Sequence, residues 1–167
     1  MPITYEPIAT TTLSTTQTTI TFSSIAGTYT DIVFVASLKM ANNTYQPILR
    51  FNSDTGNNYS STTVYGDGTS AGSARHTSQN GIYANPGAGI GTAGNFNPWI
   101  INIQNYSNAT TYKTTIARFN NSSSVVNAGV GLWRNTAAIT TVTLTAESGS
   151  GDFQSGSTFT LYGIKSA

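Results

Sequence analysis

Apolar and polar residues alternate in several short segments of the chain, and clusters of turn-forming residues separate these segments. A period of two is typical of β-strands, because successive side chains point to opposite faces of a sheet. No segment shows the 3.6-residue period of an amphipathic helix. The alternation predicts strands over residues 18–25, 30–40, 45–52, 59–66, 96–105, 111–120, 125–135, 137–147 and 157–165, with a further short strand near 81–84.

The segment over residues 30–40 carries a strong strand pattern. Ile32, Phe34, Ala36 and Leu38 share one face, and the other face begins with two valines. A strand that is apolar on both faces is typical of the interior of a sheet. We therefore expect this segment to be a central strand.

About eight strands and no helix predict an all-β protein. Two architectures fit this pattern, a jelly-roll-like β-sandwich and a closed up-and-down meander. The connections range from tight turns to one long segment, which favours the jelly-roll-like sandwich. At 167 residues the chain suits a single domain.

The predicted sandwich domain covers residues 18–167, with a long Gly- and Ser-rich loop region at 66–94. Residues 1–17 are rich in Thr and contain Pro2 and Pro7, which favour extended backbone. We expect them to form an extended N-terminal arm that lies across a neighbouring subunit. The alternative is a frayed terminus.

The low charge and the composition of the chain argue against several classes of binding partner and site. Only 8% of residues are charged and the formal net charge is +1, so no basic surface for nucleic acid is expected. No apolar run reaches the roughly 20 residues that span a bilayer, and the N-terminus lacks the pattern of a signal peptide. We expect no nucleic-acid partner, no membrane partner and no cofactor. The absence of Cys excludes disulfides, thiolate zinc sites and thiol catalysis.

The segment LRFNSDTGNNYS, residues 49–60, offers a candidate metal loop. Counted from Asp54, the sixth and twelfth positions hold tyrosines instead of the Gly and Glu of an EF-hand. The EF-hand interpretation therefore fails. An irregular calcium site that joins Asp54 to Asp67 stays open as a weaker alternative, and our expectation is no metal.

The same segment reads better as a structural turn made by Arg50, Asp54, Gly56 and Tyr59. An Asp can accept hydrogen bonds from the backbone two residues on, and a Gly can adopt positive φ. We expect Arg50 to pair with Asp54 and fix the turn. The alternative is that Arg50 binds a carboxylate of a partner subunit.

Catalytic chemistry has little support. The only histidine is His76, the chain has six acidic residues mostly in predicted turns, and no G-x-S-x-G nucleophile motif is present. We expect the protein not to be an enzyme. Arg75, His76 and Tyr83 are candidate contacts for a partner or a glycan, because rings stack on sugar faces; the alternative for the aromatic residues is core packing.

Two motifs carry a resemblance to a known family. R-F-N-x-D-x-G-x-N-Y occupies residues 50–59 and L-Y-G-I occupies residues 161–164. Together with the order of the other segments, they resemble a family of small structural proteins of tailed bacteriophages and cyanophages. The resemblance covers nearly the whole chain, although residues 66–94 match only loosely. It implies a β-sandwich on the virion surface, in a head decoration, tail or fibre protein.

From these observations we expect a capsid decoration or cement protein that stabilises the assembled head. The expected partners are further copies of the chain, as a homotrimer, and the major capsid protein or other virion proteins. Its expected location is the outer surface of the virion, after synthesis in the host cytoplasm. The alternative is a tail or fibre module that recognises host surface glycans.

Overall fold

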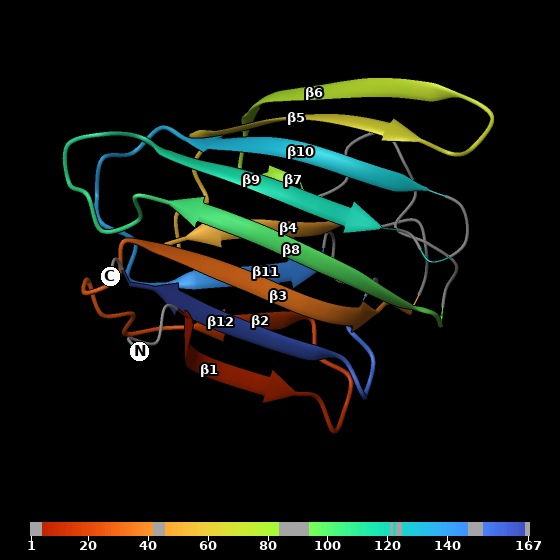
Figure 1. Ribbon diagram of the computed structural model, residues 1–167, viewed down its shortest axis with the longest axis horizontal. Helices are drawn as coiled ribbons and strands as arrows, with labels where there is room; N and C mark the ends of the chain where they lie inside the picture. The colour runs from red at the N-terminus through yellow and green to blue at the C-terminus, as the bar shows by residue number, and fades with distance from the viewer. Residues whose placement is uncertain are drawn as a thin grey trace.

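The computed structural model describes residues 5–41, 46–83, 94–120, 122, 125–146 and 152–165. Within these ranges the chain forms twelve strands and no helix, and so it contains no helix that could cross a membrane. The strands form two antiparallel sheets that enclose one core (Figure 1). The prediction of an all-β sandwich is confirmed, but the predicted number of strands, about eight, is too low.

The large sheet has eight strands. The last strand of the chain pairs with the first strand on one side and with the third strand on the other. The two ends of the described chain therefore lie side by side in one sheet. In order across the sheet, the strands are β1 (Tyr5–Thr12), β12 (Thr158–Ile164), β3 (Asp31–Lys39), β8 (Phe96–Gln104), β9 (Lys113–Asn120), β10 (Val126–Trp133), β5 (Tyr59–Gly66) and β6 (Ala71–Gln79).

The small sheet has four strands and covers one face of the large sheet (Figure 1). We call the covered face of the large sheet its inner face and the opposite face its outer face. In order, the strands of the small sheet are β2 (Thr19–Phe22), β11 (Val142–Ala146), β4 (Pro47–Phe51) and β7 (Ile82–Tyr83).

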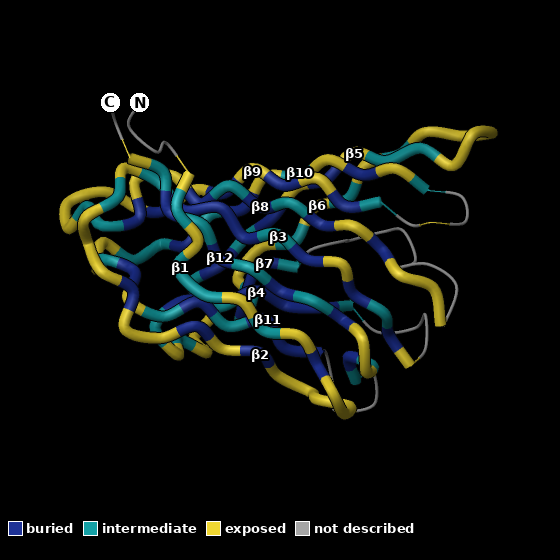
Figure 2. The backbone as a smooth tube through the Cα atoms, turned by 60° about the horizontal axis from the view of Figure 1, so that its bottom comes forward, coloured by how far each residue is buried: buried dark blue, intermediate teal, exposed yellow. Residues whose placement is uncertain are grey.

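The core lies between the two sheets, where Figure 2 shows the buried parts of the strands. Phe22 of the small sheet meets Phe34 of the large sheet edge to face, with ring centroids 6.0 Å apart. Strand β3 pairs with β12 on one side and β8 on the other, so the prediction that it is a central strand is confirmed. Even Val33, on the outer face of β3, is buried.

The expected N-terminal arm is corrected for the residues that the structure describes. Residues 5–12 form β1, which pairs with β12 as the first strand of the large sheet. A register shift between Pro7 and Ala9 marks a bulge, and proline is tolerated at such an edge because it need not donate a hydrogen bond there. Residues 1–4 lie outside the described part of the chain.

The expected loop region at residues 66–94 is also corrected. Residues 71–79 form the nine-residue strand β6 at the other edge of the large sheet. The short strand predicted near 81–84 is confirmed as β7, at residues 82–83. The sequence of β6 shows no apolar alternation because neither of its faces is fully buried. Residues 84–93 lie outside the described part of the chain.

Candidate functional site

The connection between β4 and β5, residues 52–58, forms a corner at the end of the sandwich. Two residues adopt left-handed backbone here, Asn52 at φ 50° and Ser53 at φ 57°. The Asn52 side chain fixes the corner to a distant loop: its Oδ1 accepts hydrogen bonds from the backbone N–H of Thr140 and Thr141, and its Nδ2 donates to the carbonyl of Ala138.

The positive φ expected at Gly56 is therefore wrong, because the residues before it make the turn. Gly56 is needed for space instead. A Cβ on this residue would lie 2.9 Å from the Asn58 side-chain nitrogen and 3.1 Å from an Asp54 carboxylate oxygen. Both groups take part in the hydrogen bonds that close the corner.

Asp54 is the centre of the corner. One carboxylate oxygen accepts from the Gly56 N–H at 2.8 Å. The other accepts from the Asn58 amide at 3.0 Å and from the indole Nε1–H of Trp133 at 2.8 Å. Partial burial acts to raise the pKa of Asp54, but the hydrogen bonds from Trp133, Asn58 and Gly56 outweigh it and hold this pKa below its ordinary value. The carboxylate thus joins the corner to β10.

Tyr59 closes the corner from the core side. Its ring is fully buried and stacks on the indole of Trp133 with centroids 6.1 Å apart. Its hydroxyl lies within hydrogen-bond distance of the Phe51 N–H and of the carbonyls of Phe51 and Asp54. Burial raises the pKa of Tyr59 well above its ordinary value, so it is a neutral hydrogen-bonding group.

The expected ion pair between Arg50 and Asp54 does not form. Arg50 donates from Nε to the backbone carbonyl of Asn80 at 2.8 Å, in the turn between β6 and β7. The reason is the alternation of β4: Leu49 and Phe51 point into the core, so Arg50 points away from it. The ion pair that does form in the described part of the chain joins Lys165 to Glu6, with 2.8 Å between Nζ and Oε1.

A calcium site shared by Asp54 and Asp67 is excluded by distance. The two residues lie at opposite ends of β5, and an eight-residue strand spans roughly 26 Å. Asp67 instead accepts hydrogen bonds from the backbone and hydroxyls of Ser70 and Thr69, which lower its pKa well below the ordinary value. No cluster of three or more metal-ligating side chains occurs among the residues that the structure describes.

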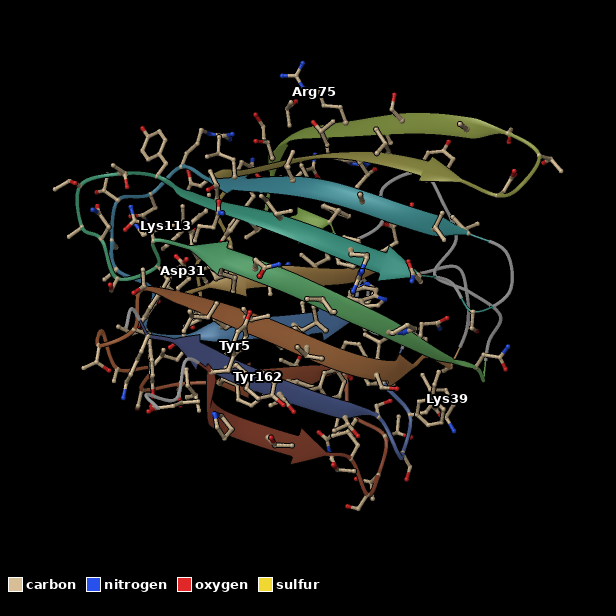
Figure 3. All side chains as sticks on the ribbon, in the orientation of Figure 1. Tyr5, Asp31, Lys39, Arg75, Lys113 and Tyr162 are labelled. Atoms are coloured by element: carbon tan, nitrogen blue, oxygen red, sulfur yellow. The ribbon has the colours of Figure 1, made fainter. Side chains whose placement is uncertain are left out.

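The three candidate contacts for a glycan or partner do not form one site. His76 pairs with the buried Ser61 and stacks on Tyr83 of the small sheet, with ring centroids 5.1 Å apart. Its neighbour Arg75 pairs with the exposed Thr62 and so lies on the outer face. Figure 3 places Arg75 at the β6 edge of the large sheet. Consecutive residues of a strand point to opposite faces, which separates Arg75 from the other two.

Lys113 is a buried cation near the corner. It is fully buried, pairs with Trp133 across β9 and β10, and donates from Nζ to the carbonyls of Thr111 at 2.7 Å and Thr136 at 3.1 Å. Burial lowers the pKa of Lys113. The two carbonyls belong to different loops, so this lysine connects the loops at the end of the sandwich (Figure 3).

The outer face of the large sheet carries a patch of exposed apolar side chains, which we call the valine patch. It consists of Val64 on β5, Ile116 on β9, and Val126, Ala128 and Val130 on β10. Four of these side chains are exposed by half or more: 59% for Val64, 50% for Ile116, 63% for Val126 and 54% for Val130. Shallow grooves run between them, with Arg118 and Arg75 among the lining residues.

Sequence reasoning did not identify this patch. A signal for it existed in the sequence. Ile116 lies on the face of its strand opposite Phe119, and its neighbours on that face, Thr114 and Arg118, are polar. The same reasoning nominated Asp54 but missed its partner Trp133, which is 79 positions away in the chain. No local pattern indicates such a contact.

No protein-family model matches the chain, and no curated protein matches it either.

Proposed function

We propose that the protein is a structural component of a bacteriophage virion, most specifically a capsid decoration or cement protein that binds and stabilises the assembled head. The observation that supports this proposal best is the valine patch. Contiguous exposed apolar side chains are typical of surfaces that bind other macromolecules. The proposed partners are further copies of the chain and the major capsid protein or other virion proteins.

The polar chemistry of the corner supports the same view. The segment that carries the R-F-N-x-D-x-G-x-N-Y motif uses its Asp, second Asn and Tyr in hydrogen bonds within the fold. The motif is thus a means of building the sandwich. A protein of this kind acts by mass action: because it binds the assembled shell and not its separated parts, it lowers the free energy of the shell.

Cryo-electron microscopy of intact particles that carry the protein tests the proposal. We expect density for the sandwich on the outside of the head. Heads that lack the protein are expected to release their contents at a lower temperature than complete heads. Density at the tail tip alone would contradict a decoration role and favour the alternative.

That alternative is a tail or fibre module for host surface glycans. The geometry gives it less support, because Arg75 lies on the opposite face from His76 and Tyr83. A glycan array probed with the folded protein separates the two functions. Binding that is lost in Tyr83→Ala and retained in Val130→Lys would favour glycan recognition over assembly.

A further inference from the structure

The valine patch lies at the centre of a five-strand surface. Val130 pairs with Ile116 on one side and Thr62 on the other, and Ala128 pairs with Arg118 and Val64. The patch thus continues across β9, β10 and β5 without a gap. Strands β8 and β6 border it on either side. On the same face, β6 presents Arg75, and β8 presents Asn102 and Gln104 together with the apolar Pro98 and Ile100.

The size of this surface is somewhat below that of a standard protein interface. Five strands spaced about 4.8 Å apart, each with about eight residues rising about 3.3 Å, cover roughly 600 Å². A stable interface of standard size buries roughly 800 Å² on each partner. An apolar centre bordered in part by polar side chains, here Arg75, Asn102 and Gln104, also fits the usual composition of such an interface.

The shape of the surface selects its occupant. The outward side chains of β5, and those of β10 apart from Leu132, are β-branched or small and stand in rows on a pleated sheet. Rows of this kind interdigitate best with the same kind of face, as when two sheets stack about 10 Å apart with their strands nearly aligned. A second copy of this chain supplies that face, and the formal net charge of +1 provides little repulsion between copies.

The arginines on the surface are compatible with a two-fold contact. An axis that runs along β10, in the plane between the two copies, places β5 of one copy over β9 of the other and β6 over β8. Arg75 then faces Asn102 of the second copy, because both lie in the row that contains Val130. Arg118 faces Val64 of the second copy, against which its long apolar stem can pack. No arginine meets its own equivalent.

We propose that the chain forms a two-fold dimer through the outer face of the large sheet, with the valine patches of the two copies in contact around β10. The proposed dimer differs from the homotrimer expected from the sequence, because a self-complementary face closes with two copies. The proposal concerns the protein in solution and does not depend on its location on a virion.

Sedimentation velocity of the full chain over a range of concentrations tests the dimer. We expect a species of twice 17.6 kDa that dissociates on dilution. Val130→Lys and Thr62→Lys place cations in the contact and are each expected to raise the dissociation constant at least about 30-fold, as at an interface hot spot. Thr21→Lys is the matched control, since Thr21 is exposed on the small sheet. It should leave the dissociation constant unchanged.

A monomer at all concentrations, a trimer, or a dimer that the two patch variants leave intact would each overturn the proposal. If a lysine variant fails to fold, cross-linking of a cysteine variant tests the same contact. The chain has no cysteine of its own. A short bis-maleimide should join two copies of Val130→Cys, near the axis, but not two copies of Thr21→Cys. Equal cross-linking of both variants would contradict the predicted contact.

Discussion

At the scale of single residues, Asp54 contributes more to the fold than its place in a turn-forming segment of the sequence implies. It joins three donors that come from two separate parts of the chain, and one of them is the indole of Trp133, a fully buried residue. Loss of the carboxylate leaves this indole N–H without its partner. An unsatisfied buried donor costs far more than a lost exposed hydrogen bond.

We therefore expect Asp54→Ala to lower the free energy of unfolding by about 2 kcal/mol. For a chain of this length, that loss corresponds to a melting temperature lower by roughly 4–8 °C. Thermal unfolding followed by circular dichroism measures the change. Thr55→Ala, at the exposed neighbouring position, should have little effect. An unchanged melting temperature in Asp54→Ala would remove Asp54 from the fold and reopen a binding role for it.

The pKa of Asp54 gives this prediction a pH dependence. Because the folded-state pKa lies below the ordinary value of 3.8, the unfolded state takes up the proton more readily. The stabilisation is present above pH 3.8 and is lost as the pH falls through the folded-state pKa. Asp54→Asn cannot titrate, so the difference in melting temperature between the wild type and Asp54→Asn should shrink as the pH is lowered through this range.

Gly163 shows how a residue of the second motif serves packing. A Cβ at this position would lie 2.3 Å from the ring of Tyr29, which covers the glycine. The Tyr29 hydroxyl in turn donates to Glu6 on β1. The glycine of L-Y-G-I thus allows an aromatic ring to lie flat on β12, next to the edge strand.

At the scale of elements, the two edges of the large sheet differ. Strand β1 carries a proline and a bulge, two devices that keep an edge from pairing with other chains. Strand β6 has no proline and carries one arginine near its middle. Strand β1 therefore protects β12, whose backbone would otherwise form the edge of the sheet.

We expect deletion of residues 1–12 to lower the melting temperature by several degrees and to promote aggregation, because it exposes the edge of β12. Differential scanning calorimetry and light scattering measure the two effects. Thr10→Ala is the control, since it removes only the hydroxyl contact with Thr160. An unchanged melting temperature after the deletion would instead support an arm that extends from the domain.

At the scale of the whole molecule, the low charge determines how the protein associates. With 8% charged residues and one ion pair among the described side chains, few of its contacts depend on ionic strength. The valine patch is apolar, and apolar contacts are not screened by salt. Assembly should then tolerate changes of medium that dissociate ionic complexes.

We expect the dissociation constant of the proposed dimer to change less than about threefold between about 0.1 and 1 M NaCl, over which the Debye length falls from about 10 to about 3 Å. Sedimentation velocity at several salt concentrations measures it. A dimer that weakens steeply with salt would indicate an ionic contact, and the valine patch would then not be the interface.

The sequence alone was sufficient to predict the strands whose two faces differ in burial, because apolar residues then alternate with polar ones along the strand. For example, Ile32, Phe34, Ala36 and Leu38 of β3 face the core as the pattern predicts, whereas β9 buries Lys113 and exposes Ile116. The edge strands β1 and β6 were not predicted, because neither face of these strands is fully buried and their sequences therefore show little apolar alternation. Turn chemistry located the corner at residues 52–58, since Asn, Asp and Gly favour turns wherever they occur.

Only the tertiary structure decided what those residues contact. Asp54 accepts a hydrogen bond from Trp133 and does not pair with Arg50. The reason is that β4 directs Arg50 away from the core, whereas β10 brings the indole beside the corner. The valine patch depends equally on the tertiary arrangement. The patch is exposed because the small sheet covers only one face of the large sheet and leaves the outer face uncovered.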